Sequence, residues 1–172
     1  MNVKRFVPFL ICPLFIGSCA TGTPMTAIYE GASLTGYKTV EITPVSNDTG
    51  KTLDFDVAAA ITQHLRSLMQ SKGYRLADTV AGSDDVLILK SSLAEYESGS
   101  ALVRWFATFE GATICTVRSS LIDKRTGNAL GEIIVPRIVS GGGLYSVGAD
   151  RWILGVVASD IVDEVDKRIR GR

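Results

Sequence analysis

"TICTVRSSLIDKRTGNALGEIIVPRIV", Thr113 to Val139, is the stretch of the sequence that decides the fold. Its first part places alternate residues on one face of an extended chain, and these are Cys115, Val117, Ser119 and Leu121. The letters "KRTGN" then predict a hairpin turn in which Gly127 adopts a positive φ. The chain returns as a second strand, in which Pro136 lacks an amide donor and indicates an edge position or a bulge.

Upstream of this hairpin, an amphipathic helix is expected over Leu53–Lys72. Asp54 or Asp56 can cap its N-terminus, and Gly73 is suited to end it in a left-handed conformation. The helix carries one apolar stripe at three- and four-residue spacing, made of Val57, Ile61, Leu65 and Leu68.

Downstream, a second helix is expected near Asp150 to Arg170. Its predicted buried stripe consists of Ile153, Val157, Ile161, Val165 and Ile169. Its polar residues are expected largely to face water, and these are Asp160, Asp163, Glu164, Lys167 and Arg168. A glycine-rich stretch, residues 141–148, leads into this helix.

Two further strands, Tyr37–Val45 and Asp85–Glu97, complete the order β-α-β-β-β-α. An amphipathic helix must bury its stripe against another element, and a sheet is the only partner of sufficient size. The sequence therefore predicts an α+β fold with one domain over residues 37–172. We expect a mixed, largely antiparallel sheet with two helices packed on one face.

The N-terminus has the organisation of a secretory signal over residues 1–18. Two basic residues precede an apolar run that is too short for a membrane-spanning helix. The run ends in Ile16, Gly17, Ser18 and Cys19, which resembles the lipobox of bacterial lipoproteins. By this resemblance, Cys19 becomes the acylated first residue of the mature chain. The alternative is an ordinary signal peptide with a chance cysteine.

Acylation of Cys19 implies a membrane as partner, because several acyl chains bind a bilayer durably. Ala20 follows Cys19, where an Asp typically signals inner-membrane retention in Gram-negative lipoproteins. We therefore expect the periplasmic face of the outer membrane. Residues 19–36 have weak periodicity and many small residues, and are interpreted as a flexible tether.

Composition narrows the possible partners and chemistry. Without Lys4 and Arg5 of the signal, the chain has 16 basic and 18 acidic residues, and it shows no basic stripe for nucleic acid. Cys115 is the cysteine left after the signal and the lipid site are assigned, so no intramolecular disulfide is expected. Its alternating surroundings favour a buried packing residue over a reactive thiol.

The segment "SGSALVRWFATFEGA", residues 98–112, concentrates aromatic residues between glycines. Together with "LIDKRTGNALGE" and the final "GADRWILGVVASDIVDEVDKRI", it resembles the bacterial lipoprotein family called domain of unknown function 4410. The resemblance implies an architecture and an envelope location, and no mechanism. Two interpretations of the segment stay open: its aromatics complete the core, or Arg104, Trp105 and Phe106 contact a partner.

Candidate catalytic and metal-binding residues are sparse. His64 is the only histidine, and it flanks the apolar stripe of a predicted helix. Asp84 and Asp85 match no calcium-loop spacing, and residues 141–148 lack the Gly-Lys-Ser/Thr of a phosphate loop. We expect no metal, no cofactor and no enzyme activity.

Our functional hypothesis is an envelope lipoprotein that serves as an adaptor or accessory subunit and contacts an unidentified envelope protein. The alternative is a small ligand-binding protein or hydrolase that uses His64 and nearby acidic residues.

Overall fold

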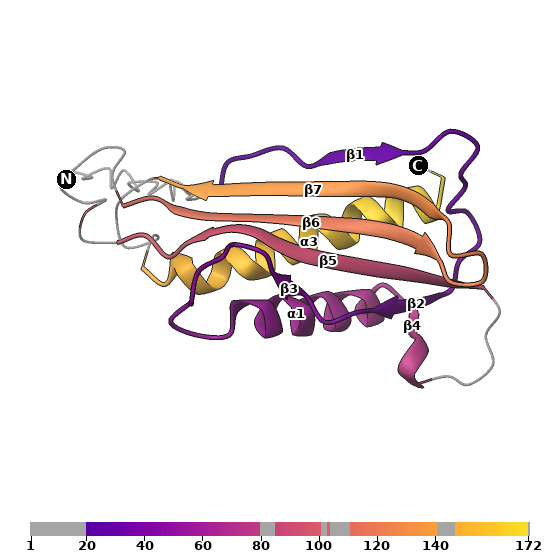
Figure 1. Cartoon of the computed structure of the whole chain (residues 1–172), viewed down its shortest axis with the longest axis horizontal. Coiled ribbons are helices and arrows are strands. Elements are labelled where there is room, and N and C mark those ends of the chain that lie inside the picture. The colour runs from indigo at the N-terminus through magenta and orange to yellow at the C-terminus, as the bar shows by residue number, and fades with distance from the viewer. Residues whose placement is uncertain (1–19, 80–84, 101–102, 104–110, 141–146, 172) are drawn as a thin grey trace, which may run out of the picture.

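The predicted hairpin forms the centre of the sheet in the computed structural model, which describes residues 20–79, 85–100, 103, 111–140 and 147–171 (Figure 1). Strands β6 (Thr113–Asp123) and β7 (Ala129–Val139) pair antiparallel, and both have the predicted bounds. Gly127 in the turn has a φ of 73°. All four residues predicted to share one face of β6 are buried.

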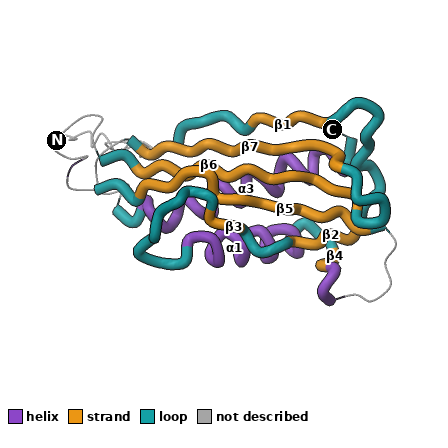
Figure 2. Tube along the Cα trace, in the orientation of Figure 1, coloured by secondary structure: helices purple, strands orange, loops and turns teal. Residues whose placement is uncertain are grey.

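Five further strands extend the sheet on both sides of this hairpin (Figure 2). The order is β1-β7-β6-β5-β2-β4, and β3 also pairs with β5. Strand β5 (Val86–Glu97) is antiparallel to β6, whereas β2 (Thr39–Ile42) and β3 (Ser46–Asn47) run parallel to β5. Strand β4 (Arg75–Leu76) is parallel to β2, and the short 3-10 helix η1 (Ala77–Thr79) follows it. The sheet is mixed, as predicted.

Both helices cover one face of the sheet, behind the strands in Figure 1. Helix α1 (Val57–Ser71) begins after Asp56, whose carboxylate accepts a hydrogen bond from the Ala59 amide at 2.8 Å. Because this cap fixes the first turn, α1 begins four residues later than predicted. Its buried stripe ends in Met69, while the predicted Leu68 is only partly buried.

Helix α3 (Ala149–Ile169) lies along β6 and β7 and contacts α1. The five residues of its predicted apolar stripe are all buried. The polar residues of α3 differ from the prediction, because Asp160 and Glu164 keep only 23% and 14% of their side chains exposed.

The segment interpreted as a flexible tether contains a strand, which corrects that interpretation. Strand β1 (Met25–Ile28) pairs antiparallel with β7. Before it, Thr21 and Ile138 exchange two backbone hydrogen bonds of 2.9 Å. Residues 20–28 are therefore joined to the sheet in two places. The sequence lacks strong apolar alternation here, so no strand was predicted. Backbone hydrogen bonds to a neighbouring strand do not require that alternation.

Pro136 lies between these two paired stretches of β7. Because alternate amides of a strand point to the same side, its nitrogen points toward the N-terminal segment, as does the Ile138 amide. Strand β7 is an inner strand, so the predicted edge position is wrong. Pro136 pairs with Thr116 of β6, but on the other side of β7 it lies in a gap between the pairs made with β1 and with Thr21. Gly22 passes so close that an added Cβ would lie 2.2 Å from the Pro136 carbonyl oxygen.

Candidate functional site

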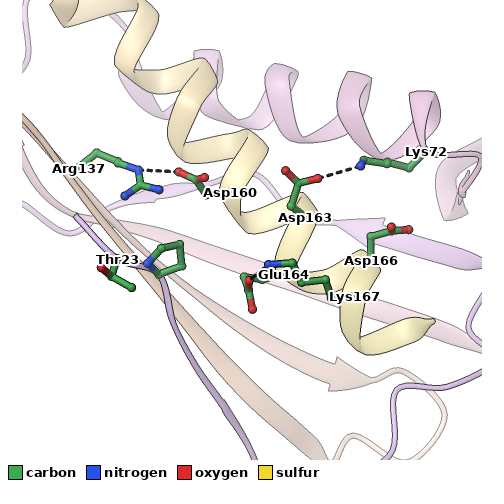
Figure 3. A pocket seen from close by; sticks show the side chains of 9 residues that line it. Thr23, Lys72, Arg137, Asp160, Asp163, Glu164, Asp166 and Lys167 are labelled. Carbon is green, nitrogen blue, oxygen red and sulfur yellow. Dashed lines mark hydrogen bonds and ion pairs between the residues drawn. The ribbon is translucent and has the colours of Figure 1, made fainter. Parts of the chain in front are cut away.

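A polar groove of about 530 Å³ opens between the N-terminal segment, helix α3 and the end of α1 (Figure 3). Thr23 lies across the groove from the acidic residues of α3, and its neighbour Pro24 also lines the groove. The acidic residues are Asp160, Asp163, Glu164 and Asp166. Arg137 of β7, together with Lys72 and Lys167, adds cationic groups to the lining.

Among the ion pairs of the described residues, the one formed by Arg137 is the most buried. Its Nε donates to an Asp160 carboxylate oxygen at 2.7 Å, and its side chain is only 11% exposed. Its Nη1 also donates to the carbonyl oxygen of Gly22. One guanidinium therefore joins β7, α3 and the N-terminal segment. Its planar arrangement of donors suits this task better than a lysine ammonium would.

The other three carboxylates each have partners as well. Asp163 pairs with Lys72 of α1's C-terminus at 2.8 Å, and this hydrogen bond raises the Lys72 pKa. Glu164 accepts hydrogen bonds from Lys167 at 2.5 Å and from Thr26 of β1 at 3.0 Å. Both bonds lower the Glu164 pKa, and the bond from Lys167 has the larger effect.

Asp166 accepts hydrogen bonds from Arg170 at 2.6 Å and from the Tyr74 hydroxyl at 2.8 Å. Burial alone would raise its pKa, but these two donors outweigh it and the pKa is lowered. Lowered pKa values keep Glu164 and Asp166 ionised at neutral pH. A general acid or base needs a pKa near the working pH, so these carboxylates are suited to holding segments together.

The residues considered for catalysis do not meet in this groove. His64 is exposed on α1 and faces Gly155 of α3, where an added Cβ would lie 3.7 Å from its ring. Asp85 lines a separate hollow beside Tyr37 and Asp123. In the described parts of the chain, no group of three or more His, Cys, Asp or Glu side chains could hold a metal ion.

Cys115 is buried in β6, as predicted, and burial raises its pKa to about 12. The thiolate is the reactive form of cysteine, so this side chain packs and does not react at neutral pH.

Sequence reasoning missed Arg137, although the strand offered a signal. Val135, Arg137 and Val139 alternate on the helix-facing side of β7, and all three are buried. A charged residue at an inward position of an apolar alternation needs a buried partner. The pattern alone does not say where along the chain that partner lies.

A second polar contact ties the start of β2 to the β6–β7 turn. The Tyr37 hydroxyl donates to the Asp123 carboxylate, which Thr126 also contacts. Burial and this hydrogen bond raise the Tyr37 pKa to about 12. The Tyr37 hydrogen bond and then those from Thr126 lower the Asp123 pKa to about 2.

We expect the free energy of unfolding of Tyr37→Phe to fall less steeply than that of the wild type as the pH rises above 10. A tyrosine whose folded pKa is raised from 10 to about 12 contributes stability that is complete below pH 10 and is lost as the pH rises toward 12. Urea unfolding at several pH values in this range measures the slope. Tyr29→Phe, at a side chain that is 47% exposed, is the matched control. Equal slopes for wild type and Tyr37→Phe would contradict the prediction.

The predicted lipid site and signal exit, Ile16 to Cys19, lie outside the described residues, as do Arg104, Trp105 and Phe106. Asp84 and most of residues 141–148 lie outside them too. Of the helices in the described ranges, none has the length and apolar character needed to cross a membrane.

Comparison with known proteins identifies the family. The family model described as domain of unknown function (DUF4410) matches residues 35–143, which is more than half of the chain. The chain belongs to this family. The DUF4410 match includes β2 through β7, whereas β1 and α3 lie outside it. Its family membership confirms the resemblance seen in the sequence. No curated protein matches this DUF4410 chain.

Solved structures with a similar fold include the PelC dodecamer from Paraburkholderia phytofirmans. That comparison gives 19% identity and a TM-score of 0.52, and covers 81% of this chain and 98% of the PelC chain. At this identity the likeness establishes a shared fold. Lipoprotein GNA1162 from Neisseria meningitidis is also similar, with 15% identity, a TM-score of 0.42, and coverage of 75% of this chain and 98% of that one.

Proposed function

We propose that this DUF4410 protein is a lipid-anchored envelope protein that acts without enzymatic activity, as an adaptor or accessory subunit at the periplasmic face of the outer membrane. The observation that carries the anchor is the sequence Ile16, Gly17, Ser18, Cys19 after a short apolar run. The lack of Asp at position 20 supports the outer membrane as destination.

An adaptor role is favoured over catalysis by the chemistry of the groove. Each acidic residue on its α3 wall has a cationic or hydroxyl partner, and His64 is not among the residues that line the groove. These interactions hold the N-terminal segment, β7 and the two helices together. A rigid domain held at a membrane is suited to positioning another protein.

Assembly is part of this proposal. PelC was solved as a dodecamer, which shows that a protein with this fold can associate with copies of itself. We propose that the present chain likewise works as one subunit of a larger envelope assembly, made of its own copies or of a second protein.

Processing at Cys19 provides the direct test of the anchor. Intact-mass analysis of the membrane fraction should show a chain that begins at Cys19 and carries a diacylglycerol. Cys19→Ser should lose this mass and leave the membrane fraction, because a serine hydroxyl is a much poorer nucleophile than a thiolate. An unmodified cysteine in the wild-type protein would contradict the proposal.

Crosslinking in the native envelope, followed by mass spectrometry, tests the adaptor role. We expect crosslinks to a defined partner or between copies, and we expect His64→Ala to leave both the crosslinks and the cellular phenotype unchanged. A folded His64→Ala protein that loses the phenotype would instead favour a hydrolase or ligand-binding role.

A further inference from the structure

One end of the domain is built where strands β5 and β7 end and where β6 and α3 begin (Figure 1). Side-chain hydrogen bonds hold these termini together. The Tyr96 hydroxyl of β5 donates to the Asp150 carbonyl of α3 at 2.8 Å, and the Thr113 hydroxyl of β6 donates to the Ser98 carbonyl at 2.8 Å. We call this surface the β7 end.

The N-terminal segment reaches the sheet at this β7 end. Thr21 and Ile138 exchange two backbone hydrogen bonds of 2.9 Å, and Ile138 is the penultimate residue of β7. The guanidinium of Arg137 binds the next carbonyl, that of Gly22. The position of Thr21 is therefore fixed relative to the domain.

Cys19 is separated from Thr21 by two residue steps, which span at most about 7 Å. A flexible tether over residues 20–36 would have given an r.m.s. separation of about 23 Å. The short connection means that a lipid on Cys19 has to leave the domain beside the β7 end.

Exposed apolar side chains gather at the same end. Val147, just before α3, is 62% exposed, and Ile138 and Val103 are each 39% exposed. They are three of the five large hydrophobic residues that are exposed in the described parts of the chain. Exposed apolar side chains at one end of a domain are suited to contact with a membrane or a protein.

We propose that the β7 end, with Ile138 and Val147, rests on the surface of the lipid bilayer. This inference depends on the proposed acylation of Cys19, because the acyl chains supply the attachment and the short connection supplies the orientation. The opposite end, with the β6–β7 turn and the end of α3, then faces away from the membrane. The length of α3 places it about 30 Å from the bilayer surface.

A fluorescent label at Val147→Cys, compared with one at Arg125→Cys in the β6–β7 turn, tests this orientation. Buried Cys115 does not compete for the label. The acylated full chain is reconstituted in phosphatidylethanolamine–phosphatidylglycerol vesicles that contain nitroxide-labelled phospholipid. We expect the label at residue 147 to lose most of its fluorescence and the label at residue 125 to keep almost all of it.

Mass analysis of the same samples separates this inference from the proposed function. If the protein is acylated and residue 147 is quenched no more than residue 125, the orientation is wrong while the anchor stands. If no acyl group is found on Cys19, both proposals are overturned.

A linker variant tests the role of the short connection. A flexible Gly-Ser insertion of about 20 residues between Ala20 and Thr21 has an r.m.s. length of about 25 Å and leaves the lipid site unchanged. We expect the quenching at residue 147 to fall several-fold. Equal quenching with and without the linker would overturn the orienting role of the connection.

Discussion

Arg137→Met is expected to lower the free energy of unfolding by about 2–4 kcal/mol at neutral pH. Removing one member of a buried ion pair leaves the other charge without a partner, which typically costs about 3–5 kcal/mol. Asp160 is 23% exposed, so solvent reduces this cost. The variant also leaves the Gly22 carbonyl without the donor that Arg137 supplies. Urea unfolding followed by circular dichroism measures the loss.

The double variant Arg137→Met/Asp160→Leu is the control for this prediction. Replacing both members of a buried pair with apolar residues of similar size is often neutral. We therefore expect the double variant to recover much of the stability that Arg137→Met loses. If Arg137→Met is no less stable than wild type, the pair does not hold the N-terminal segment in the way proposed.

Leu121→Ala is expected to lower the free energy of unfolding by about 2–5 kcal/mol, the usual cost of truncating a buried leucine. Leu121 lies on the helix-facing side of β6 and is fully buried. Its deletion leaves a cavity that the rigid sheet and α3 cannot fill by moving. Thermal and urea unfolding measure the loss.

Ile122→Ala, one residue along the same strand, is the matched control. Ile122 points to the opposite face of the sheet and is only partly buried. We expect a loss of about 1 kcal/mol. Equal losses at the two positions would contradict the assignment of the helix-covered face as the core.

The hairpin, the α3 stripe and three of the four residues of the α1 stripe could be predicted from the sequence because their signals are local. Alternation along β6 decides which of its side chains face the core, and the turn residues place β7 after it, so the bounds of both strands were correct. The stripe of α3 was correct for the same reason, since helical spacing depends only on neighbouring turns. The start of α1 could not be decided from the sequence because Asp54 and Asp56 both suit a cap, and the structure uses Asp56.

The candidate site was far less accessible to sequence reasoning. In its central contacts, Arg137 binds Gly22, which lies 115 residues earlier in the chain, and Asp160, which lies 23 residues later. The inward position of Arg137 indicated that a partner was needed. Several acidic residues on α3 could pair with an arginine. Helical periodicity placed them on the polar side of the helix, but it did not show which of them would be covered by other segments.

The sequence by itself determined the two helices, the strands β2, β5, β6 and β7, the buried faces of β6 and α3, and the burial of Cys115, because each follows from side-chain pattern over a few residues. Only the tertiary structure decided that residues 20–28 join the sheet, that Arg137 pairs with Asp160, and that Thr21 lies beside Ile138. The physical reason is that backbone pairing and ion pairs between distant segments depend on where the folded chain brings them. Nearly every residue carries a backbone amide and a carbonyl. The side-chain pattern of residues 20–28 therefore cannot show which strand their backbone groups will pair with.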